Sequence, residues 1–276
     1  MIVRGILKGV ALALSITIVC FNNRRTLPRV LDSVEGLASE VIALDSGSSD
    51  GTIELLAKRG VTLVHQPWLG FVAQKQAALD RCTQPWVLHL DSDESLEPEL
   101  RRSVERALRV DDPSIAGYQL NRKVWYAGAF LEHAWQPEWR LRLVRRGRAA
   151  WGGDDPHDAM EILRARSASE PTRVEFLEGD LRHDSIDEGI AAFLAKQAAH
   201  ARTAAASQHR RGRRGSVGRL VFSPLGEFVK QALVRGAWRD GWRGWVAASA
   251  SSAAAAMKHA ALLELSRSEE PRSERR

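Results

Sequence analysis

The sequence of 276 residues contains little cysteine and little tyrosine, with two residues of each. Two cysteines are too few for the disulfide framework of a small secreted domain, and Cys20 and Cys82 lack the close spacing of a metal site. We therefore expect a reducing compartment. No Ser-His-Asp or Cys-His constellation is evident either, so neither thiol is a candidate nucleophile.

Two phosphate-binding signatures are also missing. The chain has no G-x-G-x-x-G sequence and no Gly-Lys followed by Ser or Thr, which disfavours NAD binding and ATP hydrolysis. The apolar run at residues 10–21 is shorter than the ~20 residues of a membrane span. It also lacks a small-residue cleavage site, so we interpret it as a buried strand rather than a signal peptide.

The positive charge of the chain is concentrated in one segment. The formal net charge is +6, and hydrophobic residues make up 44%, which is enough for a sizeable core. Between residues 208 and 243, nine Lys and Arg stand against two acidic residues, a net charge of +7. This block predicts an anionic partner for the C-terminal part alone, either a membrane surface or a nucleic acid.

Short apolar runs alternate with helical patterns over the first hundred residues. This alternation predicts βαβ units and a mostly parallel sheet. Right-handed crossovers place the carboxyl ends of such strands along one edge, where ligands bind. The predicted strands are residues 10–21, 41–44, 61–65 and 86–90, and the predicted helices are 27–37, 52–59, 72–81 and 96–110.

Carboxylates follow two of these strands. Asp91 and Asp93 come directly after the strand that begins at Trp86, and Asp45 opens a Gly/Ser loop after an earlier strand. A turn that aims Asp91 and Asp93 at one hard cation suits a divalent metal holding a diphosphate. The alternative is that residues 91–94 cap the helix that follows, where anions favour the helix dipole.

The second half of the chain changes character. Residues 115–144 are strand-like and aromatic, typical of sugar-binding surfaces but also of ordinary core packing. Residues 151–158 are predicted to be an Asp-rich loop because of their Gly and Pro content. A helix is expected at 191–206, a basic linker at 208–218, and an interfacial amphipathic helix pair at 221–245. Helices that pack on the catalytic domain are the alternative, and the tail from Ser266 should be disordered.

Taken together, these motifs resemble the inverting glycosyltransferases of family 2, and more narrowly the lipopolysaccharide core glucosyltransferases of the WaaE/KdtX type. The residues that carry the resemblance are 15–22, 45–52, 66–71, 90–94 and 139–143, with Arg239 to Trp242 and Lys258 in the tail. The resemblance implies a GT-A fold, an α/β sheet with helices on both faces. The expected catalytic domain covers 1–187, with a nucleotide-sugar half at about 14–95 and an acceptor half at about 115–187. A helical basic extension at 188–265 and a tail at 266–276 follow.

The resemblance also assigns roles to residues. Catalysis falls to Asp158 as general base, with Asp155 beside it, and the metal, Mg²⁺ or Mn²⁺, falls to Asp93 and His183. The residues assigned to the nucleotide-sugar are Asn22, Asp45, Ser46, Gly47, Ser48, Gln74, Lys75 and Asp91. The residues assigned to the acceptor are Trp135, Trp139, Arg140 and Arg142. Two positions depart from the family pattern: Asn23 stands where Glu is usual, and so does Asp158.

The implied reaction is transfer of a sugar, glucose in the related enzymes, from a UDP-sugar to a hydroxyl of a membrane-anchored glycan. The implied location is cytoplasmic, on the inner face of a bacterial inner membrane with an anionic surface, and no nucleic acid partner is expected. Two alternatives stay open. One is a sugar-phosphate nucleotidyltransferase, although residues 22–23 replace the Gly-rich basic loop of such enzymes. The other is a non-catalytic basic module that binds membrane or nucleic acid.

Overall fold

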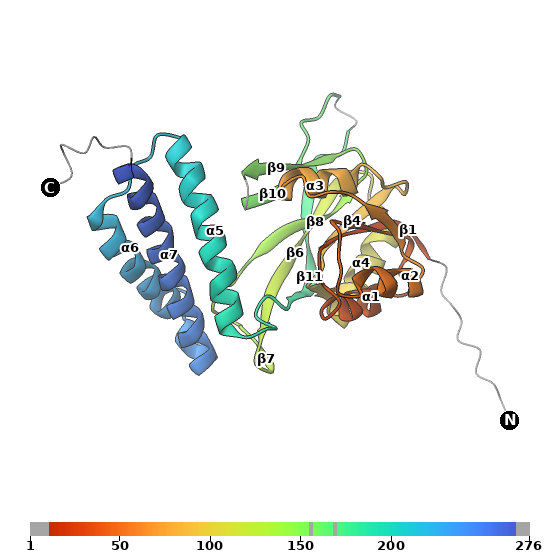
Figure 1. The fold of residues 1–276 in the computed structure, drawn as a ribbon. Helices are drawn as coiled ribbons and strands as arrows, with labels where there is room; N and C mark the ends of the chain where they lie inside the picture. The colour runs from red at the N-terminus through yellow and green to blue at the C-terminus, as the bar shows by residue number, and fades with distance from the viewer. Residues whose placement is uncertain (1–10, 155–156, 168–169, 269–276) are drawn as a thin grey trace. The chain divides into compact units, whose positions relative to one another are not determined.

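The computed structural model describes residues 11–154, 157–167 and 170–268 (Figure 1). The chain divides into two compact units. The sheet unit comprises Met1–Arg122, Trp139–Gly153 and Asp158–His183, and the helical unit comprises Lys123–Glu138, Asp154–His157 and Asp184–Arg276. The predicted domain boundary at residue 187 thus lies close to a change of unit at 184, but residues 123–138 belong with the C-terminal helices.

The N-terminal half of the sheet unit alternates strands and helices as predicted. In order it contains β1 (Leu12–Cys20), α1 (Leu27–Val34), β2 (Ala38–Asp45), α2 (Thr52–Lys58), β3 (Thr62–His65), α3 (Phe71–Leu79) and β4 (Trp86–Asp91). The strands lie in the order β3-β2-β1-β4, and each neighbouring pair is parallel. The carboxyl ends of all four strands therefore lie along one edge of the sheet.

The rest of the sheet contains antiparallel strand pairs. Beyond β4 the order continues β8-β6-β11-β5, and the short β7 pairs with β6. Their bounds are β5 (Glu94–Leu96), β6 (Ile115–Tyr126), β7 (Ala129–Phe130), β8 (Trp139–Arg145) and β11 (Arg173–His183). The strand character predicted for 115–144 is confirmed, and the result is a mixed α/β sheet.

Two local predictions are wrong. Residues 91–94 do not cap a helix, because Glu94 begins β5 and α4 (Pro98–Val110) starts later, after an N-cap at Glu97. The predicted loop at 151–158 is largely β9 (Ala149–Asp154) and β10 (His157–Ile162), which pair in a separate two-stranded sheet. Its glycines do not prevent pairing, because this short ribbon needs few side chains to cover it.

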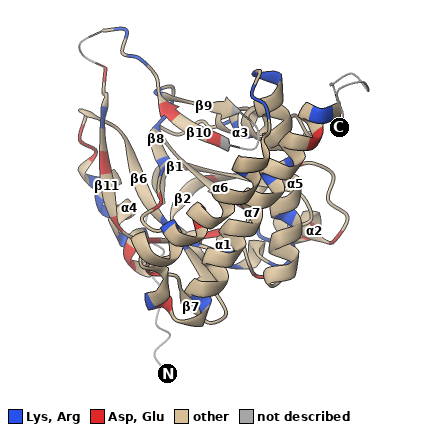
Figure 2. Cartoon of the chain, turned by 90° about the vertical axis from the view of Figure 1, so that its left-hand side faces the viewer, with Lys and Arg blue, Asp and Glu red and all other residues tan. Residues whose placement is uncertain are grey.

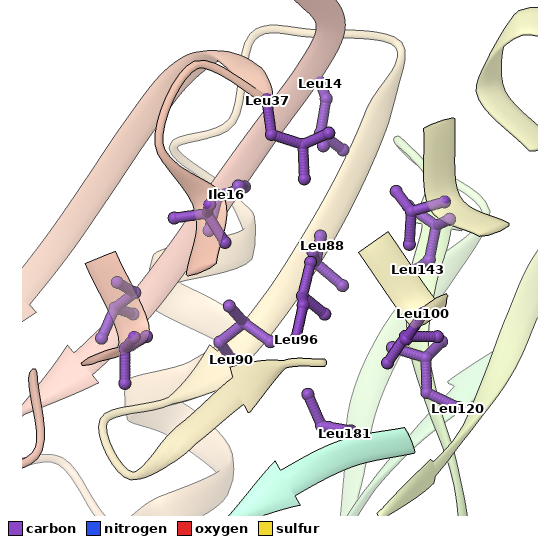
Figure 3. Packing of buried hydrophobic residues seen from close by; sticks show 14 of the residues in the cluster. Leu14, Ile16, Leu37, Leu88, Leu90, Leu96, Leu100, Leu120, Leu143 and Leu181 are labelled. Carbon is purple, nitrogen blue, oxygen red and sulfur yellow. The ribbon is translucent and has the colours of Figure 1, made fainter. Parts of the chain in front are cut away.

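The core of the sheet unit follows from strand alternation. Leu14 and Ile16 of β1 and Leu88 and Leu90 of β4 point to one face and are fully buried (Figure 3). Helices α1 and α4 cover this face, and α3 covers the other. Odd-numbered residues of β4 therefore point toward the α3 side, and this parity sets the position of the site described below.

The helical unit contains three long helices, α5 (Ile190–Arg210), α6 (Val217–Val229) and α7 (Trp242–Ser268). A π-helical turn (Lys230–Val234) and a 3₁₀ turn (Ala237–Asp240) join α6 to α7. Helix α7 packs along both α5 and α6, and half of its eight buried residues are alanines, which permit close approach. The prediction of disorder from Ser266 is wrong for its first residues, because Ser266 is buried in α7; the rest of that tail lies outside the described residues.

Candidate functional site

Asp91 stands at the centre of the candidate site, at the carboxyl end of β4. Val87, His89 and Asp91 share one face of the strand, and the buried His89 links Asp91 to β1. His89 Nε2 lies 3.3 Å from Asp91 Oδ1, and Thr17 Oγ1 lies 2.9 Å from the other ring nitrogen. Burial lowers the pKa of His89, so the ring is neutral and fixes the carboxylate mainly through hydrogen bonding.

Lys75 joins Asp91 to the predicted base. Its Nζ atom lies 2.7 Å from Asp91 Oδ1 and 2.7 Å from Asp158 Oδ2, and its side chain is 9% exposed. Lys75 comes from α3 and Asp158 from β10, so two elements far apart in the sequence converge on β4. The Nζ atom of Lys75 also lies over the indole ring of Trp151, 4.8 Å from the ring centroid. The structure thus brings Lys75, Asp91 and Asp158 together.

A second buried cation holds the other side of Asp91. Arg142 Nη2 lies 2.7 Å from Asp91 Oδ2 and 2.8 Å from Glu94 Oε1. Burial raises the pKa of Asp91, but Lys75 and Arg142 more than offset it and hold the pKa well below its usual range. Arg142 is only 4% exposed and is engaged by these two carboxylates, and its contact with an acceptor stays a prediction.

Sequence reasoning missed three members of this cluster. Glu94 is completely buried and also accepts from Arg122 at 3.3 Å, while His89 and Trp151 line the Lys75 side. The strand parity of β4 was a usable signal for His89. Nothing local marks Glu94 or Trp151, because their roles depend on partners that lie 28 to 76 positions away in the sequence.

The predicted metal ligands lie together. His183 ends β11, which pairs with β5 so that His183 is opposite Glu94. His183 Nε2 lies 3.5 Å from Asp93 Oδ2. Burial raises the pKa of Asp93, but the neighbouring His183 more than offsets it and lowers the pKa. The remaining ring nitrogen of His183, Nδ1, is buried with no hydrogen-bond partner.

This pair fits a cation that takes only part of its coordination from the protein. A carboxylate and an imidazole suit Mn²⁺ or Mg²⁺, with phosphate oxygens and water completing the shell. Within the described part of the chain, no three His, Cys, Asp or Glu side chains are grouped to hold a metal ion. Any cation here therefore relies on these two side chains together with its ligand.

Asp45 organises the loop that follows β2. Its Oδ2 accepts the backbone N–H groups of Gly47 and Ser48, both at 2.8 Å, and its Oδ1 accepts the hydroxyl of Ser48. Gly47 adopts a φ of 102°, a conformation that favours glycine. Asp45 is 1% exposed, so in this structure its carboxylate is used by its own loop. Its contact with uracil or ribose stays a prediction.

Other predicted nucleotide-sugar residues are tied to the same loop. Asn22, with a φ of 56°, accepts from the backbone of Ser49 and donates its own N–H to Ser48. Gln74 of α3 donates to Ser46 Oγ at 3.0 Å, and its Oε1 is buried with no hydrogen-bond partner. The loops after β1 and β2 therefore form one connected surface beside α3.

The remaining predicted residues are less closely grouped. Trp139 is 40% exposed and packs edge-on against Phe176 in the sheet unit, where Arg140 also lies. Trp135 belongs to the helical unit, where its Nε1 donates to Ser251 Oγ at 2.8 Å. Their acceptor roles stay predictions, and Asp155 lies outside the described residues.

The two cysteines are inert, in agreement with the sequence analysis. Burial raises the pKa of both Cys20 and Cys82 to about 12, so neither thiol ionises at neutral pH. Together, the strand-end carboxylates and the loops after β1 and β2 form the candidate site at one edge of the mixed α/β sheet.

Comparison with known proteins gives the family. The model of glycosyl transferase family 2 matches residues 15–165. A lipopolysaccharide core biosynthesis glycosyltransferase, LpsC of Rhizobium meliloti, is 30% identical over 250 residues, which cover 86% of this chain and 87% of the relative. An uncharacterized glycosyltransferase of Rickettsia conorii is 38% identical over 98 residues, covering 36% of this chain and 35% of the relative.

The chain belongs to glycosyltransferase family 2. It is a glycosyltransferase with the α/β GT-A fold and a helical C-terminal region, as the resemblance implied. Among solved structures, residues 1–349 of Staphylococcus aureus TarS align with a TM-score of 0.45 at 13% identity, covering 94% of this chain and 92% of that one. Glucosyl-3-phosphoglycerate synthase of Mycobacterium tuberculosis, with Mn²⁺ and UDP, has a TM-score of 0.33 at 23% identity, covering 44% and 45%.

Proposed function

We propose that this glycosyltransferase uses Mg²⁺ or Mn²⁺ to transfer a sugar, namely glucose, from a UDP-sugar to a hydroxyl of the lipopolysaccharide core. The observation that carries the proposal is the juxtaposition of two carboxylate systems: Asp93 with His183, and Asp91 with Lys75 and Asp158. The first system suits a cation, and the second places a carboxylate from another element beside it.

Asp93 and His183 would hold the cation through carboxylate and imidazole atoms. When bound, the metal supplies Lewis-acid stabilisation of the negative charge that develops on the departing diphosphate. Asp91 cannot easily take that place, because Lys75 and Arg142 already engage both of its oxygens. We therefore assign Asp91 to positioning, where it keeps Lys75 and Arg142 at the nucleotide-sugar edge of the sheet.

Asp158 would accept the proton of the attacking acceptor hydroxyl. Lys75 fixes its carboxylate next to Asp91, so Lys75 is a positioning residue for the base. Attack on the face of the anomeric carbon opposite to the leaving diphosphate inverts the configuration in a single displacement. This mechanism requires no covalent nucleophile, in keeping with the inert cysteines.

The acceptor is proposed from the named relative, a lipopolysaccharide core biosynthesis glycosyltransferase. Such an acceptor is anchored in lipid, so we place the enzyme at the cytoplasmic face of a bacterial inner membrane. In the described residues, no helix combines the length and the hydropathy needed to cross a bilayer.

The test is release of UDP from a panel of UDP-sugars with Mn²⁺ or Mg²⁺ and lipopolysaccharide truncated in its inner core. We expect turnover with one donor, and a loss of about a thousandfold in Asp93→Asn, because metal stabilisation of the leaving group is worth several kcal/mol. Glu178→Gln changes an exposed carboxylate of the same unit and should retain full turnover.

Asp158→Asn tests the base separately. It should reduce turnover by about a hundredfold or more while UDP and Mn²⁺ still raise the melting temperature, because donor binding does not need the base. Full turnover in Asp158→Asn would reject Asp158 as the base, and full turnover in Asp93→Asn would reject the metal mechanism. Release of pyrophosphate from a nucleoside triphosphate would instead indicate a nucleotidyltransferase.

A further inference from the structure

A row of large apolar side chains lies exposed at the surface of the helical unit. On α6 the exposed side chains recur at helical spacing along one side, and Phe222 and Leu225 are 70% and 60% exposed. The row continues through the two short turns into the start of α7. Its members are Val217, Val221, Phe222, Leu225, Val229, Leu233, Val234, Trp238, Trp242 and Trp245. We call this set the apolar face.

Helix α6 packs within its own unit mainly through residues outside the apolar face. Phe228 stacks on Trp245, a member of the face that stays 45% exposed, with ring centroids 6.0 Å apart, and Ser252 Oγ donates to the carbonyl of Pro224 at 2.9 Å. Helix α6 thus already has a partner in α7. Burial within the helical unit therefore does not account for the exposed row, which a monomer in water would normally keep small.

Basic residues are interspersed through the segment that carries the apolar face. Lys and Arg recur along the C-terminal helices (Figure 2), and those of this segment are Arg210, Arg211, Arg213, Arg214, Arg219, Lys230, Arg235, Arg239 and Arg243. Of the two acidic residues there, Asp240 is turned inward: its carboxylate accepts the backbone N–H groups of residues 132–134 and is 4% exposed. Glu227 pairs with Lys230 at 3.2 Å. The outward charge is therefore strongly positive.

Three tryptophans mark one end of the apolar face. Trp238, Trp242 and Trp245 are each about half exposed, and guanidinium groups lie over two of them, at 5.4 Å for Arg239 on Trp238 and 4.9 Å for Arg243 on Trp242. Indole rings with an apolar body and a polar N–H prefer the boundary between hydrocarbon and headgroups. Indole rings next to guanidinium groups therefore suit a partner surface that has an apolar interior and anionic groups at its boundary with water.

We propose that the apolar face is a docking surface for an anionic lipid bilayer, into which Phe222, Leu225 and their neighbours insert while the basic rim binds lipid phosphates. A second copy of the chain is a poor occupant, because a two-fold interface would bring two strongly basic rims together. A nucleic acid would satisfy the basic rim but leave the apolar face in water. A bilayer with anionic headgroups satisfies both.

The experiment uses the full chain with two kinds of large unilamellar vesicle. One contains phosphatidylcholine alone, and in the other about one lipid in three is the anionic phosphatidylglycerol. Flotation should show binding to the anionic vesicles that weakens with added salt. The double variant Phe222→Ser with Leu225→Ser should bind at least about tenfold more weakly, because two buried apolar side chains are lost from the bilayer.

The matched control is Val110→Ser, which removes an equally exposed apolar side chain, 76% exposed, from α4 of the sheet unit. It should bind vesicles like the unchanged protein. Far-ultraviolet circular dichroism checks that each variant is folded. Equal binding by the double variant and the unchanged protein would overturn the proposal. So would a dimer, seen by light scattering, that the double variant abolishes, because the face would then be covered by a second copy.

This proposal deepens the proposed membrane location but does not depend on catalysis. Flotation needs no donor, no metal and no acceptor. Vesicle binding can therefore be absent while UDP release is observed, and UDP release can be absent while vesicle binding is observed. Asp93→Asn should float with anionic vesicles as the unchanged protein does, since Asp93 lies in the sheet unit. The double variant should in turn keep its melting-temperature response to UDP and Mn²⁺.

Discussion

The two units of this protein use their charged residues in opposite ways. The sheet unit buries them: Lys75 and Arg142 are 7% and 4% exposed, and together with Arg122 they hold Asp91, Glu94 and Asp158. The helical unit carries many basic side chains in its C-terminal segment, and the carboxylate of Asp240 there ties a loop. The contrast is between a buried cluster of several ions in the sheet unit and a carboxylate that binds backbone N–H groups in the helical unit.

The difference reflects the packing of each unit. A mixed sheet with loops at its strand ends leaves polar side chains from several elements facing one another, and these must be paired because an isolated buried charge is costly. Three helices packed through alanines leave no such space, so charge stays at the surface. The buried cluster should therefore be sensitive to the loss of a single ion, whereas the helical unit should be sensitive to added volume.

The largest effect is expected from Arg142→Met. It removes the cation that pairs with the completely buried Glu94 and with Oδ2 of Asp91, which should cost about 3–5 kcal/mol of unfolding free energy. Arg106→Met is the matched control, since its ion pair with Glu178 is 59% and 79% exposed, and it should change stability by less than about 0.5 kcal/mol. Urea titration measures both, and equal effects would remove the contrast between buried and surface charge.

Added volume in the helical unit should come next. A Cβ atom on Gly244, at the start of α7, would lie 1.7 Å from the carbonyl oxygen of Ala237, so Gly244→Ala should destabilise the unit by about 1–3 kcal/mol. Gly226→Ala, on α6, meets nothing within 4 Å and should stabilise it by about 0.5–1 kcal/mol. Melting temperatures that move in the same direction would show that close helix packing does not limit this unit.

Asp240→Asn should destabilise the helical unit by about 1–3 kcal/mol, because three backbone N–H groups lose a carboxylate acceptor. Glu188→Gln, on a half-exposed side chain 4.0 Å from Lys196, is the matched control and should be neutral. Thermal unfolding followed by tryptophan fluorescence reports both variants. Retention of full stability in Asp240→Asn would mean that the loop at 132–134 is held by other contacts.

The smallest effect concerns pH. Burial raises the pKa of Asp240, but the N–H donors of residues 132–134 more than offset it, so the pKa lies below its ordinary value of 3.8. Its contribution to stability is therefore present above that ordinary value and is lost as the pH falls through the lowered pKa. Between about pH 5 and about pH 3, the unchanged protein should lose stability more steeply than Asp240→Asn. Parallel melting curves would contradict the assigned role.

Much of the fold could be predicted because its signals are local. The alternation of apolar runs and helical patterns specified β1 to β4 and α1 to α3 within a few residues, and the parallel order then placed Asp45 and Asp91 at one edge. The errors fall where pairing is not local. Residues 149–162 form a two-stranded sheet despite their glycines, and Glu94 joins β5 instead of capping α4.

The residues of the candidate site differ in the same way. Sequence patterns and the family resemblance mark Asp91, Asp93, Asp158 and His183, whose roles stay predictions. Their partners were not found. Arg142 was expected at the acceptor, but it lies under Asp91 because β8 pairs with β4 and turns its side chain inward. The paired residues of β4 and β8 are 55 to 59 positions apart, so neither segment alone indicates that the two strands pair.

The sequence by itself determined the family, the strand-end carboxylates and the basic C-terminal segment, since composition, short motifs and hydrophobic periodicity are properties of neighbouring residues. Only the tertiary structure decided which charges are neutralised. Lys75 lies between Asp91 and Asp158, Arg142 faces inward, Asp240 is removed from the surface, and Phe222 stays on it. The physical reason is that the free energy of a charge or an apolar group depends on what surrounds it, and long-range packing alone sets those surroundings.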